Sequence, residues 1–370
     1  MKQNDVIVLG GGIAGVSAAA EIAAEARVTV IEAEPSIGYH ATGRSAALFI
    51  RNYGNATLRA LNAASAPFLD APDGVSDRSL LSPRGELLVA NESEMDALEA
   101  YADGASGLER LSPAEAVEIV PILRQESIVA ALLERDAQDI DVDRMLQGYA
   151  RLLRHRGGRI VTGLRVGALR HEAGLWRIET EGGEITAPVL INAAGAWADM
   201  VARAAGAAPL GITPLRRSAA ILPMPEEVAL DDWPMFASAA ESWYAKPEAG
   251  KLMVSPADED PVDPHDAWPD DMVLAEGLHR YEQAVTVPVS RVERSWAGLR
   301  SFAPDRSPVV GFDPARTGLF WLAGQGGYGV QTAPALSRLA ADLCLGRAAA
   351  LPPHVVSALS PGRFATAGSA

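Results

Sequence analysis

Short apolar runs and helically spaced apolar residues alternate from the start of the chain. Val6–Leu9 is an apolar run directly before three glycines, which is typical of a strand buried in a parallel sheet. Across residues 13–26 apolar residues recur every three or four positions, as on one face of a helix. Val28–Ile31 is a second apolar run. This order predicts a strand–helix–strand unit.

The rest of the chain also divides into helical and strand patterns. Helices are predicted over residues 93–104, 112–118, 143–156 and 332–345. Strands are predicted over residues 80–90, 160–166, 176–180, 189–192 and 319–322. Residues 216–300 are rich in Pro, Trp and Asp, and their short strand candidates at 219–222 and 252–254 suit an antiparallel sheet.

This pattern predicts a mixed α/β (α+β) protein with two interleaved domains, because 370 residues exceed one small core. We expect a Rossmann-type nucleotide domain built from residues 1–80, 141–215 and 301–370. A mostly antiparallel substrate domain would take residues 81–140 and 216–300.

A glycine motif follows the first predicted strand. Gly10, Gly12 and Gly15 form G-x-G-x-x-G, in which the first permits a tight turn, the second a close pyrophosphate and the third close helix packing. Glu32 ends the second predicted strand, where a carboxylate accepts hydrogen bonds from ribose hydroxyls and repels a 2′-phosphate. The unit predicts FAD or NAD rather than NADP. The alternative is a glycine turn that serves packing alone.

Two further segments of small residues follow predicted strands. Residues 193–197 contain Gly195, and residues 324–329 are rich in glycine and precede the last predicted helix. Small residues let a backbone lie close to a cofactor, and a helix N-terminus stabilises negative charge on a reduced flavin. These segments favour FAD. For residues 324–329 the alternative is a turn without a ligand.

Composition and charge exclude several classes of function. Hydrophobic residues make up 48% of the chain and charged residues 21%, as in ordinary globular proteins. The net charge of −15 disfavours nucleic-acid binding, which needs clustered Lys and Arg. Cys344, the single cysteine, cannot form an internal disulfide and is expected on the buried face of the last helix. The six histidines show no metal-ligand spacing, so no metal site is expected.

Two sequence features bear on localisation. No window approaches the roughly 20 apolar residues of a transmembrane helix, and the first residues lack the pattern of a signal peptide. We therefore expect a cytoplasmic protein, with peripheral attachment to the inner membrane face as an open alternative.

Four longer segments resemble the D-amino-acid oxidase-like (DAO) family of FAD-dependent oxidoreductases, and most closely its bacterial D-arginine dehydrogenases. They are residues 38–47, 80–84, 296–302 and 325–332, and the resemblance extends over nearly the whole chain. It implies an FAD-binding domain interleaved with the substrate domain, as in D-amino-acid oxidase and glutathione reductase.

The resemblance also implies the cofactor contacts. FAD would lie against the glycine motif, Gly195 and a set of mostly small residues. This set comprises Ala14, Glu32, Ala33, Ala41, Thr42, Gly43, Arg44, Ser45, Ala46, Ala47, Leu48, Val166, Gly326, Gly327, Tyr328, Gly329, Val330 and Gln331.

The resemblance assigns the substrate contacts as well. Arg217 and Arg300 would bind the substrate carboxylate with help from Tyr244, and the carbonyl of Gly327 would accept the substrate amine. The side-chain end of the substrate would meet Tyr53, Glu86 and Gln331, and residues 239–250, with Glu241, would form a lid. The chemistry agrees, because the planar donor fork of arginine fits a carboxylate.

The chain departs from the D-arginine dehydrogenases in its substrate pocket. These enzymes carry a His and a Thr where this chain has Leu48 and Ile50, which removes polar groups from the expected pocket. We therefore expect D-amino acids with larger apolar or mixed side chains, while Glu86 keeps basic substrates possible. No Cys lies near residues 296–300, so FAD is expected to be non-covalent.

The expected reaction is oxidative deamination, in which hydride passes from Cα to flavin N5 and the imino acid hydrolyses to a 2-oxo acid and ammonia. The electron acceptor is expected to be O₂ or a quinone-type molecule. Alternative reactions are oxidation of a secondary amine or glycine and oxidation of a 2-hydroxy acid. A non-catalytic FAD-binding protein is the alternative from another class.

Overall fold

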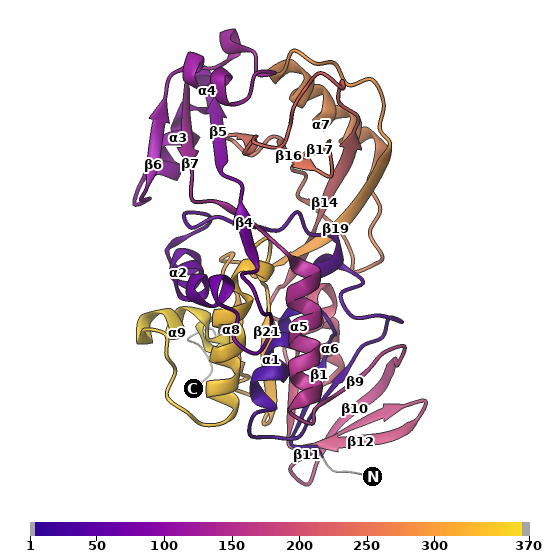
Figure 1. The fold of residues 1–370 in the computed structure, drawn as a ribbon. Coiled ribbons are helices and arrows are strands. Elements are labelled where there is room, and N and C mark those ends of the chain that lie inside the picture. Colours follow the sequence, from indigo (N-terminus) through magenta and orange to yellow (C-terminus); the bar gives the residue numbers. More distant parts are fainter. Residues whose placement is uncertain (1–3, 365–370) are drawn as a thin grey trace.

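The computed structural model describes residues 4–364, which form two lobes (Figure 1). One lobe contains a six-stranded sheet and the other a nine-stranded sheet. This confirms the predicted mixed α/β fold with a Rossmann-type part. Within residues 4–364, no helix has the length and apolar character needed to cross a membrane.

The six-stranded sheet has the order β20-β21-β13-β1-β2-β9, and all its pairs except β20–β21 are parallel. Its strands are β1 (Val6–Leu9), β2 (Val28–Ile31), β9 (Arg159–Val161), β13 (Val189–Asn192), β20 (Val309–Phe312) and β21 (Leu319–Ala323). The central β1 is entirely buried because it has strands on both edges and layers on both faces.

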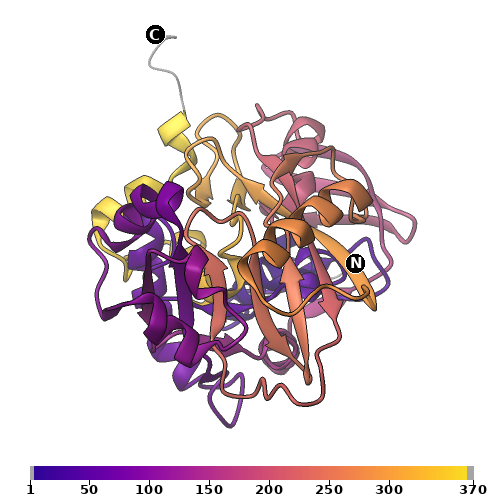
Figure 2. The ribbon, with the colours of Figure 1, turned by 90° about the horizontal axis from the view of Figure 1, so that it is seen from above.

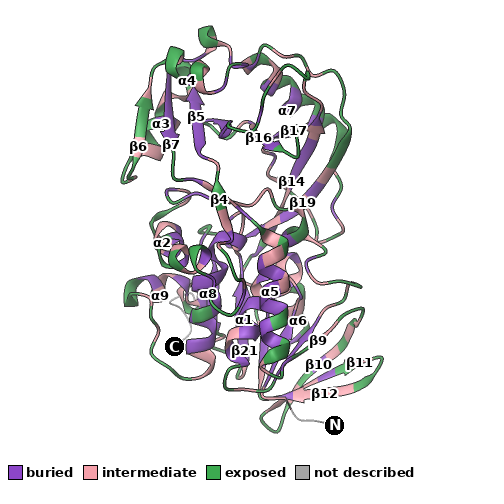
Figure 3. Cartoon of the chain, in the orientation of Figure 1, coloured by how far each residue is buried: buried purple, intermediate pink, exposed green. Residues whose placement is uncertain are grey.

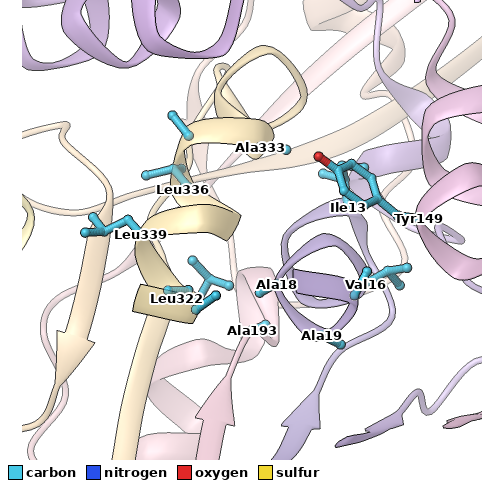
Figure 4. Close-up of a cluster of buried hydrophobic side chains, with 14 of the residues drawn as sticks. Ile13, Val16, Ala18, Ala19, Tyr149, Ala193, Leu322, Ala333, Leu336 and Leu339 are labelled. Carbon is cyan, nitrogen blue, oxygen red and sulfur yellow. The ribbon is translucent and has the colours of Figure 1, made fainter. Parts of the chain in front are cut away.

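Helices cover one face of this sheet. They are α1 (Ile13–Ile22), α5 (Val142–His155) and α8 (Gly329–Cys344), while α2 (Ala56–Asp70) packs on α8 and α9 (Pro353–Leu359) packs beside α2 and β20. Figure 4 shows the core beneath α8, where Leu322, Leu336 and Ala18 belong to one apolar cluster. Small residues on α1 allow this helix to pack closely, and Figure 3 shows α1 and α8 as largely buried.

A small sheet and a short helix cover the opposite face. The sheet consists of β10 (Val166–Glu172), β11 (Leu175–Thr180) and β12 (Gly183–Ala187), and the helix is α6 (Ala198–Ala204). Trp176 of β11 is fully buried and packs in one cluster with Ile7 and Leu9 of β1. Both faces of the parallel sheet are therefore shielded from water, as parallel sheets require.

The second lobe is built on the nine-stranded sheet, whose order is β18-β14-β17-β16-β15-β5-β7-β6, with β19 paired to β14. Only β15 and β5 pair in parallel. The strands are β5 (Glu86–Ala90), β6 (Leu108–Leu111), β7 (Ala130–Glu134), β14 (Thr213–Leu222), β15 (Met235–Ser238), β16 (Tyr244–Glu248), β17 (Lys251–Ser255), β18 (Asp260–Pro261) and β19 (Arg294–Phe302). Figure 2 views these strands from above.

Short elements complete this lobe and its connection to the first. The helices are α3 (Met95–Ala102), α4 (Pro113–Ile119) and α7 (Asp271–Ala284). A three-stranded antiparallel sheet of β3 (Leu48–Phe49), β8 (Gln138–Ile140) and β4 (Leu81–Pro83) joins segments distant in sequence.

The structure corrects three local predictions. The predicted strand 160–166 is interrupted, because the amides of Gly163 and Leu164 bond to carbonyls of Glu34 and Glu32 and turn the chain away from β9. The first helix ends at Ile22 rather than at residue 26. Cys344 is half-buried rather than buried, since it lies in the last turn of α8.

Candidate functional site

One cavity of about 540 Å³ extends between the carboxyl ends of the parallel strands and the second sheet. Dinucleotides bind at this edge in open parallel sheets. Sixteen of the expected cofactor residues line it. These are Gly10, Gly12, Ala14, Glu32, Ala33, Ala41, Thr42, Arg44, Ser45, Ala46, Val166, Gly195, Gly326, Gly327, Gly329 and Val330. Four expected substrate residues, Arg217, Tyr244, Arg300 and Gly327, line the same cavity.

The glycine motif closes one end of the cavity. Gly10 has φ +114°, and a Cβ there would lie 2.3 Å from the carbonyl oxygen of Ala193. A Cβ on Gly15 would lie 2.0 Å from the carbonyl oxygen of Gly10, so Gly15 serves the contact between α1 and its turn and does not line the cavity. Only glycine permits this close turn at the start of α1.

Glu32 fixes the end of β2. Its Oε2 accepts a hydrogen bond from the amide of Gly11 at 2.6 Å, and its Oε1 accepts one from the amide of Glu34 at 2.8 Å. The carboxylate is therefore held at the cavity wall beside Ala33 and Val166. A fixed anion in this place suits ribose hydroxyls and repels an additional phosphate.

The loop at residues 41–48 crosses from the first lobe to the second. The hydroxyl of Thr42 accepts a hydrogen bond from the amide of Ile13 at 3.0 Å, which fixes the loop to the start of α1. Arg44 donates to the carbonyls of Ala267 and Ala297 at 2.9 Å and pairs with Asp266. Because protein groups engage the guanidinium of Arg44, it serves mainly to hold this loop against the second lobe.

The remaining residues of this loop lie behind the cavity wall. Gly43, Ala47 and Leu48 do not line it. Leu48 belongs to β3 and pairs with Asp139 of β8. The buried Lys246 donates from Nζ to the carbonyl of Ala46 at 3.0 Å and so supports the loop from β16.

The glycine-rich loop before α8 forms another wall. Gln325 lines the cavity, and its buried Nε2 has no hydrogen-bond partner among the residues that the structure describes. Tyr328 and Gln331 lie behind the wall. Gln331 accepts a hydrogen bond from the amide of Ile50 and donates to Asn62, both at 3.0 Å, so its side chain braces neighbouring chain segments.

Strand register brings the two arginines together. Arg217 of β14 pairs with Gly298 of β19, and Arg300 lies two residues further along β19. Residues two apart on a strand share a face, so the two arginines are diagonal neighbours, about 7–8 Å apart at the backbone. Tyr244 lies on the same face, because the pairings through β17 connect it to Arg217 with the same alternation.

The guanidinium of Arg217 is buried and only partly engaged. Its Nη2 donates to Oε1 of Glu259 at 2.9 Å, whereas its Nε is buried without a partner among residues 4–364. An unpaired buried donor is costly, and a bound anion would satisfy it.

Arg300 remains charged inside the protein. No carboxylate within the described part of the chain lies within 4.0 Å of its nitrogens. Burial lowers the pKa of Arg300, but more distant groups raise it above its ordinary value: Tyr53, Tyr244, Glu241 and Glu259. This guanidinium lies so close to Gly327 that a Cβ there would be 3.0 Å from its Nη1.

The residues expected to contact the substrate side chain lie beyond Tyr244, as seen from Arg217. Tyr53 and Glu86 do not line the cavity. Glu86 is on the same sheet face as Tyr244, through Met235 and Ala237 of β15. The intervening cluster is apolar and includes Ile50, Leu88, Leu132, Met235 and Ala237, with Tyr53 and Tyr244 packed against it.

Glu86 is a buried acid without a cationic partner in the described residues. It accepts a hydrogen bond from the hydroxyl of Tyr101 at 2.7 Å and lies opposite the buried Glu134. Burial raises the pKa of Glu86 to about 8, although the bond from Tyr101 opposes this shift. Glu134 is satisfied separately by Asn52 and the amide of Arg51.

The structure also alters the expected lid. Tyr244–Glu248 is strand β16, paired on both edges, so within residues 239–250 only short turns are free of the sheet. Glu241, with φ +52°, lies in the exposed turn before this strand.

Several residues of the site were not predicted from the sequence, among them Gln325, Met253 and Glu259. Gln325 and Met253 line the cavity, and Glu259 engages Arg217. Met253 and Glu259 follow from strand alternation only after the pairing of β14 with β17 and β18 is known. Gln325 could have been found from the sequence, because it begins the segment 325–332 that resembles the DAO family.

The comparisons with known proteins agree with this geometry. A model of the DAO family, described as FAD dependent oxidoreductase, matches residues 5–343. Glycine oxidase of Geobacillus kaustophilus is 25% identical over 358 residues, which cover 92% of each chain. The crystal structure of glycine oxidase from this organism has a TM-score of 0.84, with 22% identity over 98% of this chain and 99% of that one.

Two other solved structures share the fold. L-proline dehydrogenase from P. horikoshii has a TM-score of 0.83 and 23% identity, with 98% of both chains covered. L-alpha-glycerophosphate oxidase from Mycoplasma pneumoniae, with FAD bound, has a TM-score of 0.81 and 20% identity over 95% of this chain and 97% of that one.

The residues present fit an FAD molecule. The glycine turn at α1 and the fixed carboxylate of Glu32 suit the nucleotide end, and the glycine-rich loop before α8 leaves a buried amide donor on Gln325. Together with the match over residues 5–343, these features establish that the chain belongs to the DAO family of FAD-dependent oxidoreductases and uses FAD as its cofactor.

Proposed function

We propose that this enzyme oxidatively deaminates D-amino acids with apolar or cationic side chains. The observation that carries the proposal is the pair Arg217 and Arg300, which share one sheet face and line the cavity of the cofactor. Two guanidinium groups in a chain of net charge −15 form a local site for an anion, and an amino acid supplies a carboxylate. The D configuration rests on the resemblance of the four sequence motifs to D-arginine dehydrogenases.

FAD is proposed to lie non-covalently along the cavity from Glu32 to Gly327. Cys344, the single cysteine, is in the last turn of α8 and does not line the cavity, so no thiol is placed to attach the flavin. When bound, FAD supplies the two-electron acceptor for the reaction.

The protein's own groups would bind and orient the substrate. The unpaired Nε of Arg217 and the guanidinium of Arg300 would hold the carboxylate, with the hydroxyl of Tyr244 beside them. The carbonyl of Gly327 would accept a hydrogen bond from the substrate amine. Contacts at both groups fix the orientation of Cα, and such orientation contributes several kcal/mol to catalysis.

The apolar cluster behind Tyr244 would receive the side chain. Leu88, Met235 and Ile50 offer apolar surface, and Glu86 offers an acid at the far end. Because burial raises the pKa of Glu86 to about 8, a cationic side chain would favour its ionised form. Tyr53 and Gln331 would shape this end, Gln331 by bracing the backbone of Ile50.

Two other reactions are alternatives for the same site. Glycine oxidase and L-proline dehydrogenase suggest glycine or a secondary amine as substrate, and a 2-hydroxy acid is the other alternative that the sequence left open. An anaerobic panel of D- and L-amino acids, glycine derivatives and hydroxy acids distinguishes these classes by the rate of flavin bleaching. Faster bleaching by D-amino acids than by the other compounds supports the proposal. Absence of bleaching with every compound of the panel would indicate a non-catalytic FAD protein.

The electron acceptor is identified in a second step, by measuring whether the reduced flavin is reoxidised by air or by a quinone.

The cofactor contact is tested at Glu32. Replacement Glu32→Arg removes the acceptor of ribose hydroxyls and adds a charge at the cavity wall, so we expect a large loss of bound flavin after gel filtration. Glu25→Arg, an exposed control on the same lobe, makes the same charge change and should retain flavin. Equal flavin content in all three proteins would remove Glu32 from the site.

The anion site is tested at Arg300. Arg300→Met keeps much of the side-chain volume but removes the charged donor, so kcat/KM should fall at least about 100-fold, or ~3 kcal/mol. Arg294→Met, at the exposed start of the same strand, is the control. A near-normal kcat/KM in the Arg300 variant would contradict the assignment.

The close contact between Gly327 and Arg300 is tested by adding one methyl group at residue 327. Gly327→Ala would place a methyl group 3.0 Å from Nη1 of Arg300 and so displace this guanidinium. We expect a higher KM for amino acids with FAD retained, measured by steady-state kinetics and flavin absorbance. An unchanged KM would show that the position of Arg300 does not control substrate binding.

The contact of Glu86 with the substrate side chain is tested by the pH dependence of substrate preference. Because the pKa of Glu86 is raised to about 8, its carboxyl is mostly protonated at pH 7 and becomes anionic above pH 8. The ratio of kcat/KM for D-arginine to that for D-leucine should therefore rise severalfold between pH 7 and 9. Glu86→Leu should abolish this rise. A ratio that changes equally in both proteins would exclude Glu86 from the pocket.

A further inference from the structure

Three consecutive acids meet the strand segment that carries Arg217. In the pairing of β18 with β14, Asp260 lies opposite Arg216. Asp258 accepts hydrogen bonds from the amide and hydroxyl of Ser218, at 2.6 and 2.8 Å. Side chains alternate along a strand, so the side chain of Glu259 lies on the opposite face from those of Asp258 and Asp260. Of these three acids, Glu259 alone contacts Arg217.

Glu259 holds two arginines with one oxygen atom. Its Oε1 accepts a hydrogen bond from Nη2 of Arg217 and another from Nη2 of Arg306, both at 2.9 Å. Burial raises the pKa of Glu259, but Arg306, Arg217 and Arg300 outweigh this effect and lower the pKa below its ordinary value. The carboxylate is therefore ionised at neutral pH.

Arg306, whose side chain is 45% exposed, packs on an aromatic ring. Its backbone adopts φ +59°, which is uncommon for a residue with a Cβ. Its guanidinium lies 3.8 Å above the ring of Phe302, and that ring packs against Gly326 of the cofactor loop. Glu259 thus contacts Arg306 on one side and Arg217 on the other.

Glu259 opposes the positive charge of the anion site. Arg217 and Arg300 both line the cavity, and Glu259 accepts a hydrogen bond from Arg217 and raises the pKa of Arg300 from a greater distance. Without Glu259 this opposing negative charge would be lost, and Arg217 would lose its only side-chain acceptor within residues 4–364.

We propose that Glu259 is a positioning residue that orients Arg217 and offsets part of the positive charge that attracts a substrate carboxylate. This inference rests on the proposed function, because it takes Arg217 as a ligand of the substrate carboxylate. It adds a determinant outside the cavity wall, since Glu259 does not line the cavity.

The test separates charge from orientation in the FAD-loaded enzyme. Glu259→Gln keeps an oxygen acceptor for both arginines but removes the negative charge, and Glu259→Ala removes both. The probe is 4-methylpentanoate, which is leucine without its amine, and its Kd is measured by the change in flavin absorbance. Asp260→Asn makes the same charge change one residue away, at an acid that pairs with Arg216.

We expect Glu259→Gln to bind 4-methylpentanoate about fivefold more tightly than the unaltered enzyme, because one opposing charge is lost. Asp260→Asn should change this Kd less than twofold. Glu259→Ala should reduce D-leucine-dependent flavin reduction at saturation at least tenfold relative to Glu259→Gln, because Arg217 is no longer oriented.

Two results would overturn the proposal: an unchanged or weaker Kd in Glu259→Gln, or equal reduction rates in the Gln and Ala variants. Failure of the unaltered enzyme to bind 4-methylpentanoate at all would instead contradict the carboxylate site itself. The two failures are therefore distinguishable.

Discussion

The antiparallel pairing of β14 with β19 is the constraint on which the site depends. It places Arg217 and Arg300 diagonally on one face, and it directs that face toward the cavity at the carboxyl ends of the parallel strands. A shift of one residue in this register would turn one arginine to the opposite face. The pairing continues without interruption from Thr213 to Ile221, which fixes the register strongly.

Burial makes this arrangement chemically useful. Guanidinium groups remain charged where other bases would lose a proton, so Arg300 keeps its charge although it is half-buried. The neighbouring acids limit the excess of positive charge, and the unpaired Nε of Arg217 leaves one donor for a ligand. Next to this polar site, the cluster around Met235 and Leu88 is apolar. These residues are buried behind Tyr244 and do not line the cavity.

The sequence predicted the strands of the parallel sheet well. Strands β1, β2 and β13 were predicted with their observed bounds, because each is a short apolar run that ends at glycine, a charged residue or a small-residue turn. The strand predicted at 160–166 failed because tertiary hydrogen bonds from Gly163 and Leu164 break a run that is locally compatible with a strand.

Prediction of the site was limited by long-range contacts. The arginines came from resemblance, and the strand register then explained how they meet. The surroundings of Gln331 depend on bonds to Ile50 and Asn62, which are remote in sequence, and no local pattern reveals them. Glu259 was missed for the same reason: a carboxylate within Asp258-Glu259-Asp260 is an ordinary surface acid until β18 is paired with β14.

In the proposed site, the paired guanidinium groups of Arg217 and Arg300 hold a substrate carboxylate beside the flavin. The most direct test of this contact compares D-leucine with D-leucinamide, which keeps the amine and side chain but lacks the negative charge. The measurement is the second-order rate constant of anaerobic flavin reduction. We expect this rate constant to be at least about 100-fold higher for D-leucine, because D-leucinamide loses a charge-assisted contact. Equal rate constants for the acid and the amide would contradict this arrangement.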